Sequence, residues 1–427
     1  MFKGLSKEEK SWIMFDWANQ SYVMIVMTTI MSLHFLSAAA NAGVDAADAS
    51  AFWGLGNSIS TFIAGIIAPI LGTLSGYRGK KKLLFNFFNF VAIIATIGLA
   101  FVPEQYWFIL LIVFVISSIG YAGGSKIYDS FLVDVAPDEN MHRVSSAGFA
   151  MGYIGGALAF ILAIILVVLA EFEITTMTVT TAYRLSFVIA GVWWIIFYIP
   201  MFKNVNQKYG IAQEPNYIKK SFMRVLDTLK EVVQHKKILL FLIAFFLYSD
   251  GVGSIIRMAT AYGDTIGIGA MTLLMVLLVT QFVAFPFAII YGKMANKFGA
   301  KKTIYFGIAT YVLVCLIALF MNPERDLETL TIMFWALAML VGTAQGGIQA
   351  LSRSYFSKII PKEKSNEFFG IYNIFGRFAS IIGTTLFGIV ALATGQPHYG
   401  IAVIAVLFII AAIIFKFVPD DREIEAK

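Results

Sequence analysis

Lysine and arginine residues alternate along this chain between basic segments and segments that carry almost no cations. Apolar stretches of about 20 residues, the length that crosses the hydrocarbon core of a bilayer, recur from Trp12 to Val418. The basic segments hold cations at 3–10, 78–82, 143, 203–237, 293–302, 358–364 and 416–427, whereas the intervening segments hold only Arg325. Because cytoplasmic loops carry the excess of Lys and Arg, this alternation predicts a many-pass membrane protein with both termini in the cytoplasm.

The composition agrees with a membrane protein. The chain is 59% hydrophobic and 14% charged, whereas a soluble domain has about 25% charged residues. The net charge of +6 follows from the cytoplasmic bias and meets anionic lipid headgroups, so we expect membrane lipid and no nucleic acid as a partner. Cys315 stands alone, which excludes an intrachain disulfide and a cysteine-rich metal site. The polar N-terminus is unlike a cleaved signal peptide, so the first apolar run is expected to be a retained span.

The apolar runs predict an all-α integral membrane protein of about twelve transmembrane helices. The expected spans are 12–37, 51–74, 83–103, 106–134, 144–170, 183–202, 238–262, 269–292, 302–321, 328–357, 366–393 and 398–418. The long polar segment 203–237 divides them into two six-helix bundles, 1–202 and 238–427.

The polar segment 203–237 is itself expected to contain a helix. Its apolar residues from Ile218 to Val233 recur at the spacing of one helical face, and lysines and arginines occupy the remainder. This pattern fits a helix on the cytoplasmic membrane surface and equally an ordinary solvated linker helix.

An internal repeat supports the division into two halves. A glycine-rich loop that ends in lysines follows span 2 at Gly72 and recurs after span 8 at Gly292, an offset of 220 residues. Span 4 ends at Pro137 and span 10 at Pro361, an offset of 224. Duplicated halves of this kind are how many secondary transporters are built.

These two loops resemble the loop signature of the major facilitator superfamily, Gly-x-Leu-Ala-Asp-Arg-x-Gly-Arg-Lys. The residues that carry the resemblance are Gly72, Gly79, Gly292, Asn296 and Gly299. In the first copy Gly76 stands where aspartate is usual and Tyr77 where arginine is usual. Both differences fall on residues of the first-half gate salt bridge that is typical of the superfamily.

Further segments are similar to the vacuole effluxer-like branch of this superfamily. They are Phe15–Tyr22, Tyr128–Pro137, Arg143–Gly156, Tyr248–Gly251 with Ile256–Met258, and Glu367–Arg377. The resemblance covers nearly the whole chain and implies the twelve-helix, two-bundle fold of a solute porter. Eukaryotic relatives export amino acids from a vacuole, and the absence of an organelle signal favours a bacterial inner (plasma) membrane here.

Ionisable groups inside membrane spans cost about 2.5–3.5 kcal/mol each on insertion scales, so they normally face a cavity or a partner. Asp250 lies near the bilayer midplane, where it would carry a coupling proton, bind a substrate ammonium group, or pair permanently with Arg257 on the same helix face. Arg377 lies at a similar depth, one turn beyond Asn373. A buried guanidinium favours bidentate binding of a substrate carboxylate as much as pairing with a fixed acid such as Asp250.

Span 10 carries a polar stripe of Gln345, Gln349 and Arg353 on one face. The glutamines reach the middle of the membrane and are candidate solute ligands, whereas Arg353 lies near the cytoplasmic end. Asp129 precedes Arg353 by 224 residues, so the two are repeat equivalents of opposite charge and predict a cytoplasmic gate pair. Lys126, one turn deeper than Asp129, is expected to pair locally or to line the cavity.

The first span adds three polar residues. Asn19 and Tyr22 lie in its inner half and middle, where they either contact the solute or bond to neighbouring helices, worth about 0.6 kcal/mol on average. Asp16 is expected within the first turn, where the helix dipole and capping explain an acidic residue.

The duplicated halves and midplane charges favour a secondary transporter, acting as a monomer, for a small polar solute with a carboxylate, such as an amino acid. Rocking of the two bundles would give alternating access, with a proton as candidate coupling ion. A membrane enzyme is the main alternative from another class, but the chain has no HExxH, GxSxG or cysteine cluster. A lipid flippase of the same fold is the second alternative. We expect no cofactor and no metal.

Overall fold

The computed structural model describes residues 2–213, 217–321, 324–378 and 381–420. The side chains of Ile218 and Arg377 are outside the described part of the chain. Within the described ranges the regular elements are helical, apart from one β-bridge between Tyr77 and Ile211.

The first half begins with a helix that continues through a π-helical stretch. Ser6 caps it, since its hydroxyl accepts from the Glu9 N–H and its own N–H donates to Glu9. The elements are α1 (Lys7–Tyr22), η1 (Val23–Thr29), α2 (Ile30–Asn41), α3 (Ala46–Gly76), α4 (Lys80–Gly98), η2 (Leu99–Phe101), η3 (Glu104–Tyr106), α5 (Trp107–Ser130), α6 (Leu132–Val135), α7 (Met141–Glu171) and α8 (Val179–Asn204).

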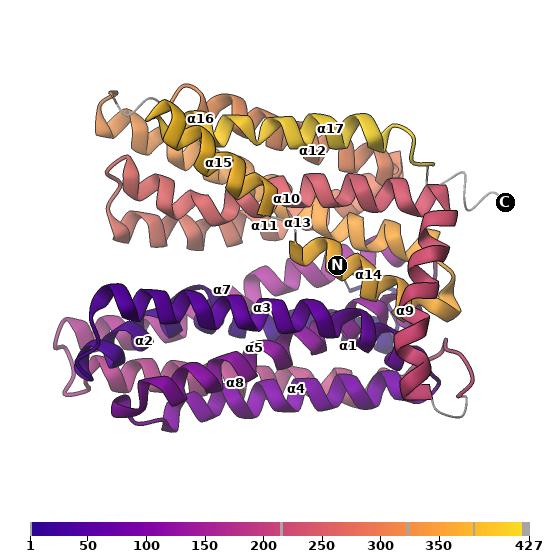
Figure 1. Cartoon of the computed structure of the whole chain (residues 1–427), viewed down its shortest axis with the longest axis horizontal. Coiled ribbons are helices and arrows are strands. Elements are labelled where there is room, and N and C mark those ends of the chain that lie inside the picture. The colour runs from indigo at the N-terminus through magenta and orange to yellow at the C-terminus, as the bar shows by residue number, and fades with distance from the viewer. Residues whose placement is uncertain (1, 214–216, 322–323, 379–380, 421–427) are drawn as a thin grey trace.

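The second half follows a helix that runs across one end of the molecule, α9 (Tyr217–Gln234) (Figure 1). We call this end the α9 end. The remaining elements are α10 (Lys236–Thr265), α11 (Ala270–Phe298), α12 (Ala300–Ala318), α13 (Leu327–Ile359), η4 (Lys362–Lys364), α14 (Ser365–Phe378), α15 (Ile381–Thr394), α16 (Pro397–Val403) and α17 (Ala405–Phe415).

In the described residues, 11 helices are long and apolar enough to cross a membrane. The first ten predicted spans coincide with ten of these helices. The twelfth predicted span coincides with the helix that begins at His398. The predicted span 366–393 corresponds to α14 and α15, of which Ile382–Thr394 is a shorter apolar helix.

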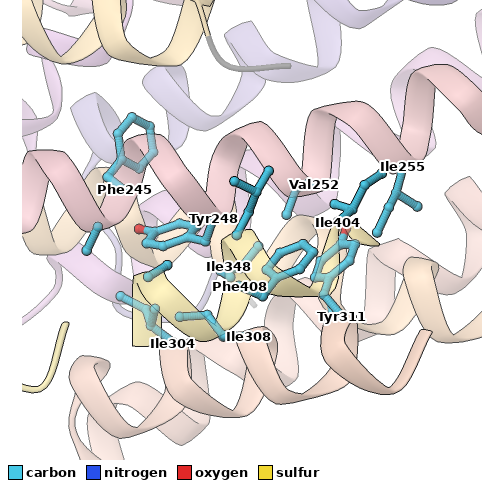
Figure 2. Packing of buried hydrophobic residues seen from close by; sticks show 14 of the residues in the cluster. Phe245, Tyr248, Val252, Ile255, Ile304, Ile308, Tyr311, Ile348, Ile404 and Phe408 are labelled. Atoms are coloured by element: carbon cyan, nitrogen blue, oxygen red, sulfur yellow. The ribbon is translucent and has the colours of Figure 1, made fainter. Parts of the chain in front are cut away.

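The buried apolar residues form two clusters, one from residues 5–205 and one from residues 232–418. Figure 1 shows the corresponding helices as two groups that lie alongside each other. Close packing inside the second group is seen in Figure 2, where Tyr248 of α10 points toward α12 and α17. The Tyr311 and Phe408 rings stack there with centroids 5.2 Å apart.

The two groups meet through polar contacts toward the α9 end. His142 Nδ1 lies 2.8 Å from the Ser354 hydroxyl, and the Ser145 hydroxyl donates to the Ala350 carbonyl over 2.7 Å. The more exposed Lys362 pairs with Asp138 at 3.0 Å. Within the described ranges, this end of the seam between the halves is therefore closed by short polar contacts.

Candidate functional site: a central cavity and its charged floor

A cavity of about 480 Å³ lies between the two halves. Helices α5 and α7 line it on one side and α10, α13 and α14 on the other. Its polar lining consists of Tyr121, Ser125, Lys126, Asp129, Tyr248, Ser249, Arg257, Gln349, Arg353, Tyr372 and Asn373. Such a volume and lining suit a small polar molecule.

Arg353 closes the cavity toward the α9 end by joining three helices. Its Nη1 lies 3.0 Å from Asp129 Oδ1 of α5, and its Nη2 lies 3.4 Å from Asp16 Oδ2 of α1. The Nε donates to the Ser145 hydroxyl of α7 over 3.0 Å. Only 3% of the Arg353 surface is exposed, so these partners replace the water that a buried guanidinium loses.

Aromatic rings complete the surroundings of this guanidinium. Its central carbon lies 4.6 Å from the ring centre of Trp12 and 4.4 Å from that of Phe149. Trp12 in turn stacks on Tyr128 with centroids 4.5 Å apart. Cation–π contacts of this kind gain strength in a desolvated site. Aromatic residues of the first half therefore hold in place an arginine that the second half contributes.

The expectation for Asp16 was wrong. The helix begins at Lys7 with the Ser6–Glu9 capping box, which places Asp16 in the third turn, beyond the reach of the N-terminal amides. Its Oδ2 accepts from the Tyr128 hydroxyl over 2.8 Å and faces Arg353. One arginine therefore serves two carboxylates, Asp16 and Asp129. An acid several turns into an apolar helix was the signal that could have revealed this.

Two further cations lie on the cavity wall. Lys126 is half-buried, and its Nζ donates to the Asn373 carbonyl across the seam over 3.4 Å. Arg257 of α10 is exposed and lines the same cavity. The structure thus brings Lys126, Arg257, Gln349 and Asn373 together around one space.

Gln345 belongs to a different space. It lines a smaller cavity of about 110 Å³ inside the second half, whose other residues are almost all apolar, as Leu273, Phe334 and Leu337 illustrate. The stripe predicted on span 10 is therefore divided, because Gln349 and Arg353 face the central cavity.

Asn19 and Tyr22 are buried within the first half and are not part of the central cavity lining. The Tyr22 hydroxyl lies 2.8 Å from the hydroxyl of Ser117 and 3.0 Å from that of Ser118. Tyr22 thus makes the bond between neighbouring helices that was one of the two sequence-based alternatives.

Asp250 is fully buried, and its Oδ2 accepts from the Gly383 N–H over 2.7 Å. Gly383 belongs to α15 (Ile381–Thr394), so this bond joins α10 to a neighbouring helix. The bond gives this buried carboxylate a polar partner within the protein. The coupling role of Asp250 stays a prediction, as does substrate binding by Arg377, whose side chain lies outside the described residues.

The glycines of the loop signature serve turns and close contacts. Gly79 and Gly299 have φ angles of 79° and 92°, which favour glycine. A Cβ at Gly72 would lie 2.7 Å from the Asn366 carbonyl oxygen, and one at Gly292 would lie 2.8 Å from Ser146. Asn296 lines a cavity of about 430 Å³ near this seam.

Solved structures with the same architecture are transporters of the major facilitator superfamily. The proton:xylose symporter XylE aligns over 98% of both chains with a TM-score of 0.73 and 13% identity. The transporter FucP, in its outward conformation, aligns over 97% of this chain and 98% of its own, with a TM-score of 0.71 and 14% identity. At such low identity the likeness shows the fold, which is the major facilitator fold.

Comparison with related sequences identifies the family to which this transporter fold belongs here. The family described as "Vacuole effluxer Atg22 like" matches residues 46–427. The uncharacterized MFS-type transporter YxiO of Bacillus subtilis is 47% identical over 421 residues, which are 99% of this chain and 97% of YxiO. Autophagy-related protein 22 of Yarrowia lipolytica is 26% identical over 340 residues, 72% of this chain and 55% of the fungal protein. The chain belongs to the Atg22-like vacuole effluxer family.

The resemblance seen in the sequence motifs is thereby confirmed, and the protein is a multi-pass membrane transporter of the major facilitator superfamily. Its bacterial relative is consistent with the predicted bacterial inner (plasma) membrane. The relatives and structural neighbours are transporters, which favours transport over the enzyme alternative.

Proposed function

We propose that this protein is a monomeric secondary transporter that moves a small carboxylate-bearing solute, with an amino acid as the leading candidate, by alternating access. The observation that carries the proposal is the central cavity of about 480 Å³ between the halves. Its floor is the Arg353–Asp129 pair at 3.0 Å, which opposite halves contribute. Rocking of the halves about this space would expose it to one side of the membrane at a time.

The charge of the cavity supports an anionic group on the solute. Three cations, Lys126, Arg257 and Arg353, belong to its lining, and the carboxylates beside them are Asp129 and Asp16, both paired with Arg353. A concave site with an excess of positive charge favours anionic ligands, and here Lys126 and Arg257 supply that excess. The aromatic and amide side chains around it would receive the rest of an amino acid.

The function is tested by counterflow of radiolabelled amino acids in proteoliposomes. We expect label to accumulate transiently when the vesicles are preloaded with the same unlabelled solute, because a porter exchanges bound solute across the membrane. Accumulation against a gradient on imposing a proton gradient would identify the proton as coupling ion, with Asp250 and Asp129 as candidate carriers. A protein that shows no exchange but scrambles fluorescent lipid would be the flippase alternative.

We also propose twelve spans in two six-helix bundles, with α14 and α15 forming the eleventh and both termini cytoplasmic. The support is the Lys and Arg bias of the loops. Single cysteines at Lys80, Lys220, Lys301 or Lys362 in a Cys315→Ala background are expected to resist impermeant thiol reagents in intact cells. A cysteine at Asp48, exposed in the first turn of α3 on the opposite side, is expected to react. Reaction of any of the first four from outside would refute this topology.

A further inference from the structure

The altered loop of the first half lies directly against the start of α14. A Cβ at Gly72 would lie 3.0 Å from the Cα of Gly370, so the α3 and α14 backbones touch. At the next turn a Cβ at Gly76 would lie 3.6 Å from Glu367 Oε1. The carboxylate of Glu367 therefore lies beside the position where the superfamily signature has an aspartate in the loop itself.

Glu367 is held there by α9. Only 4% of the residue is exposed, and its Oε1 accepts from Arg224 Nη2 over 2.7 Å. The other carboxylate oxygen accepts from the Thr228 hydroxyl over 2.8 Å. The Arg224 guanidinium also lies 5.5 Å from the ring centre of Tyr77, a fully buried residue of the first half. Arg224 thus contacts both halves across the seam.

Other contacts attach α9 to the second half. Glu231 pairs with Lys364 at 2.7 Å, and Val232, 3% exposed, packs into the apolar cluster of that half. By contrast, Met223 and Val233 are more than 60% exposed, at 63% and 64%. These apolar residues on the outer face favour the membrane-surface alternative for this helix.

We infer that α9 takes part in closing the seam between the halves at this end, which acts as a gate. Arg224 is the positioning residue that allows Glu367 to be buried against Gly76 and near Tyr77. An acid in the second half and an arginine in the linker take the place of the usual aspartate and arginine of the loop. The inference rests on the proposed alternating access.

The gate works through the burial of Glu367. With the seam closed, Gly76 lies against the carboxylate and Tyr77 against its partner Arg224, and a buried charge is tolerated only with its partners in place. Opening the seam would draw α3 away from α14 and expose Glu367 to water, where Arg224 matters less. Arg224 therefore stabilises the closed seam more than the open one.

The test measures how often the seam opens, in the absence of solute. A cysteine replaces Ala68 of α3, which is 1% exposed and lies at the seam beside Gly370, in a Cys315→Ala background. The purified full-length protein in lipid nanodiscs reacts with a maleimide. We expect Arg224→Ala to accelerate labelling about tenfold or more, the effect of losing one hydrogen bond to a charged group. Lys230→Ala is the matched control, because Lys230 is 75% exposed on the same helix, and it should label at the parent rate.

A second pair of variants separates gating from damage to the fold. Gly76→Asp restores the superfamily residue but sets a carboxylate against Glu367, so we expect faster labelling. Gly76→Asp combined with Glu367→Gln removes the repulsion and should return labelling to near the parent rate, which a misfolded protein would not do. Parent-like labelling of Arg224→Ala, or no recovery in the double variant, would overturn the inference. Neither result depends on solute, so the transport proposal would be unaffected.

Discussion

Replacing Arg353 with alanine is expected to reduce counterflow at least about a hundredfold. Removing one partner of a buried ion pair costs about 3–5 kcal/mol, and each 1.4 kcal/mol is about tenfold in an equilibrium. Here the loss leaves two carboxylates, Asp16 and Asp129, without their shared counter-ion. Counterflow and thermal unfolding are measured on the same preparation. Lys362→Ala, which breaks the more exposed pair with Asp138, should change transport by less than about fivefold.

Charge reversal tests whether the Arg353–Asp129 attraction itself is needed. Asp129→Arg combined with Arg353→Asp preserves that attraction but leaves a carboxylate at position 353 facing Asp16, 3.4 Å from the present guanidinium. We therefore expect weak recovery in the double variant and greater recovery when Asp16→Asn is added. A triple variant no better than the worst single one would show that the pair does not act as a gate.

The sequence predicted this pair because a duplicated chain places repeat equivalents at matching depths. Asp129 and Arg353, 224 residues apart, were matched by that offset alone and meet at 3.0 Å. The same offset matches Asp16 to Leu240, so it gives no indication of a charged partner for Asp16. Its partner comes from the other half, and only the packing of α1, α5 and α13 brings the three side chains together.

Hydropathy predicted the membrane helices for a similarly simple reason. A span must be apolar along its whole length, so a run of consecutive residues is enough to predict it. The direction in which one polar side chain points depends on the tilt and contacts of several helices. Gln345 and Gln349 share one helical face, yet they line two different cavities. The same limit applies to Asp250, whose place in an apolar span could be predicted from consecutive residues, whereas its bond to Gly383 depends on how α10 packs against α15.

Replacing Lys126 with glutamine is expected to weaken binding of a carboxylate-bearing solute about tenfold or more, the range for hydrogen bonds to charged groups. Lys126 is half-buried in the cavity lining, and its Nζ donates to the Asn373 carbonyl, 3.4 Å away, which holds the ammonium group at the seam. Lys126→Arg keeps the charge and should retain most of the affinity. Arg257→Gln is the matched control, because Arg257 lines the same cavity but is more exposed, and we expect a smaller loss there.

Amidation of the solute identifies which cation binds its carboxylate. In the wild-type protein, the amide should bind about tenfold or more weakly than the acid, since the charged contact is lost. In Lys126→Gln the two solutes should bind nearly alike, because the cation that distinguishes them is gone. If the preference for the acid survives in Lys126→Gln but disappears in Arg377→Lys, the carboxylate binds to Arg377 through the planar fork that lysine cannot reproduce. Lys126 would then contribute to the seam between the halves rather than to solute recognition.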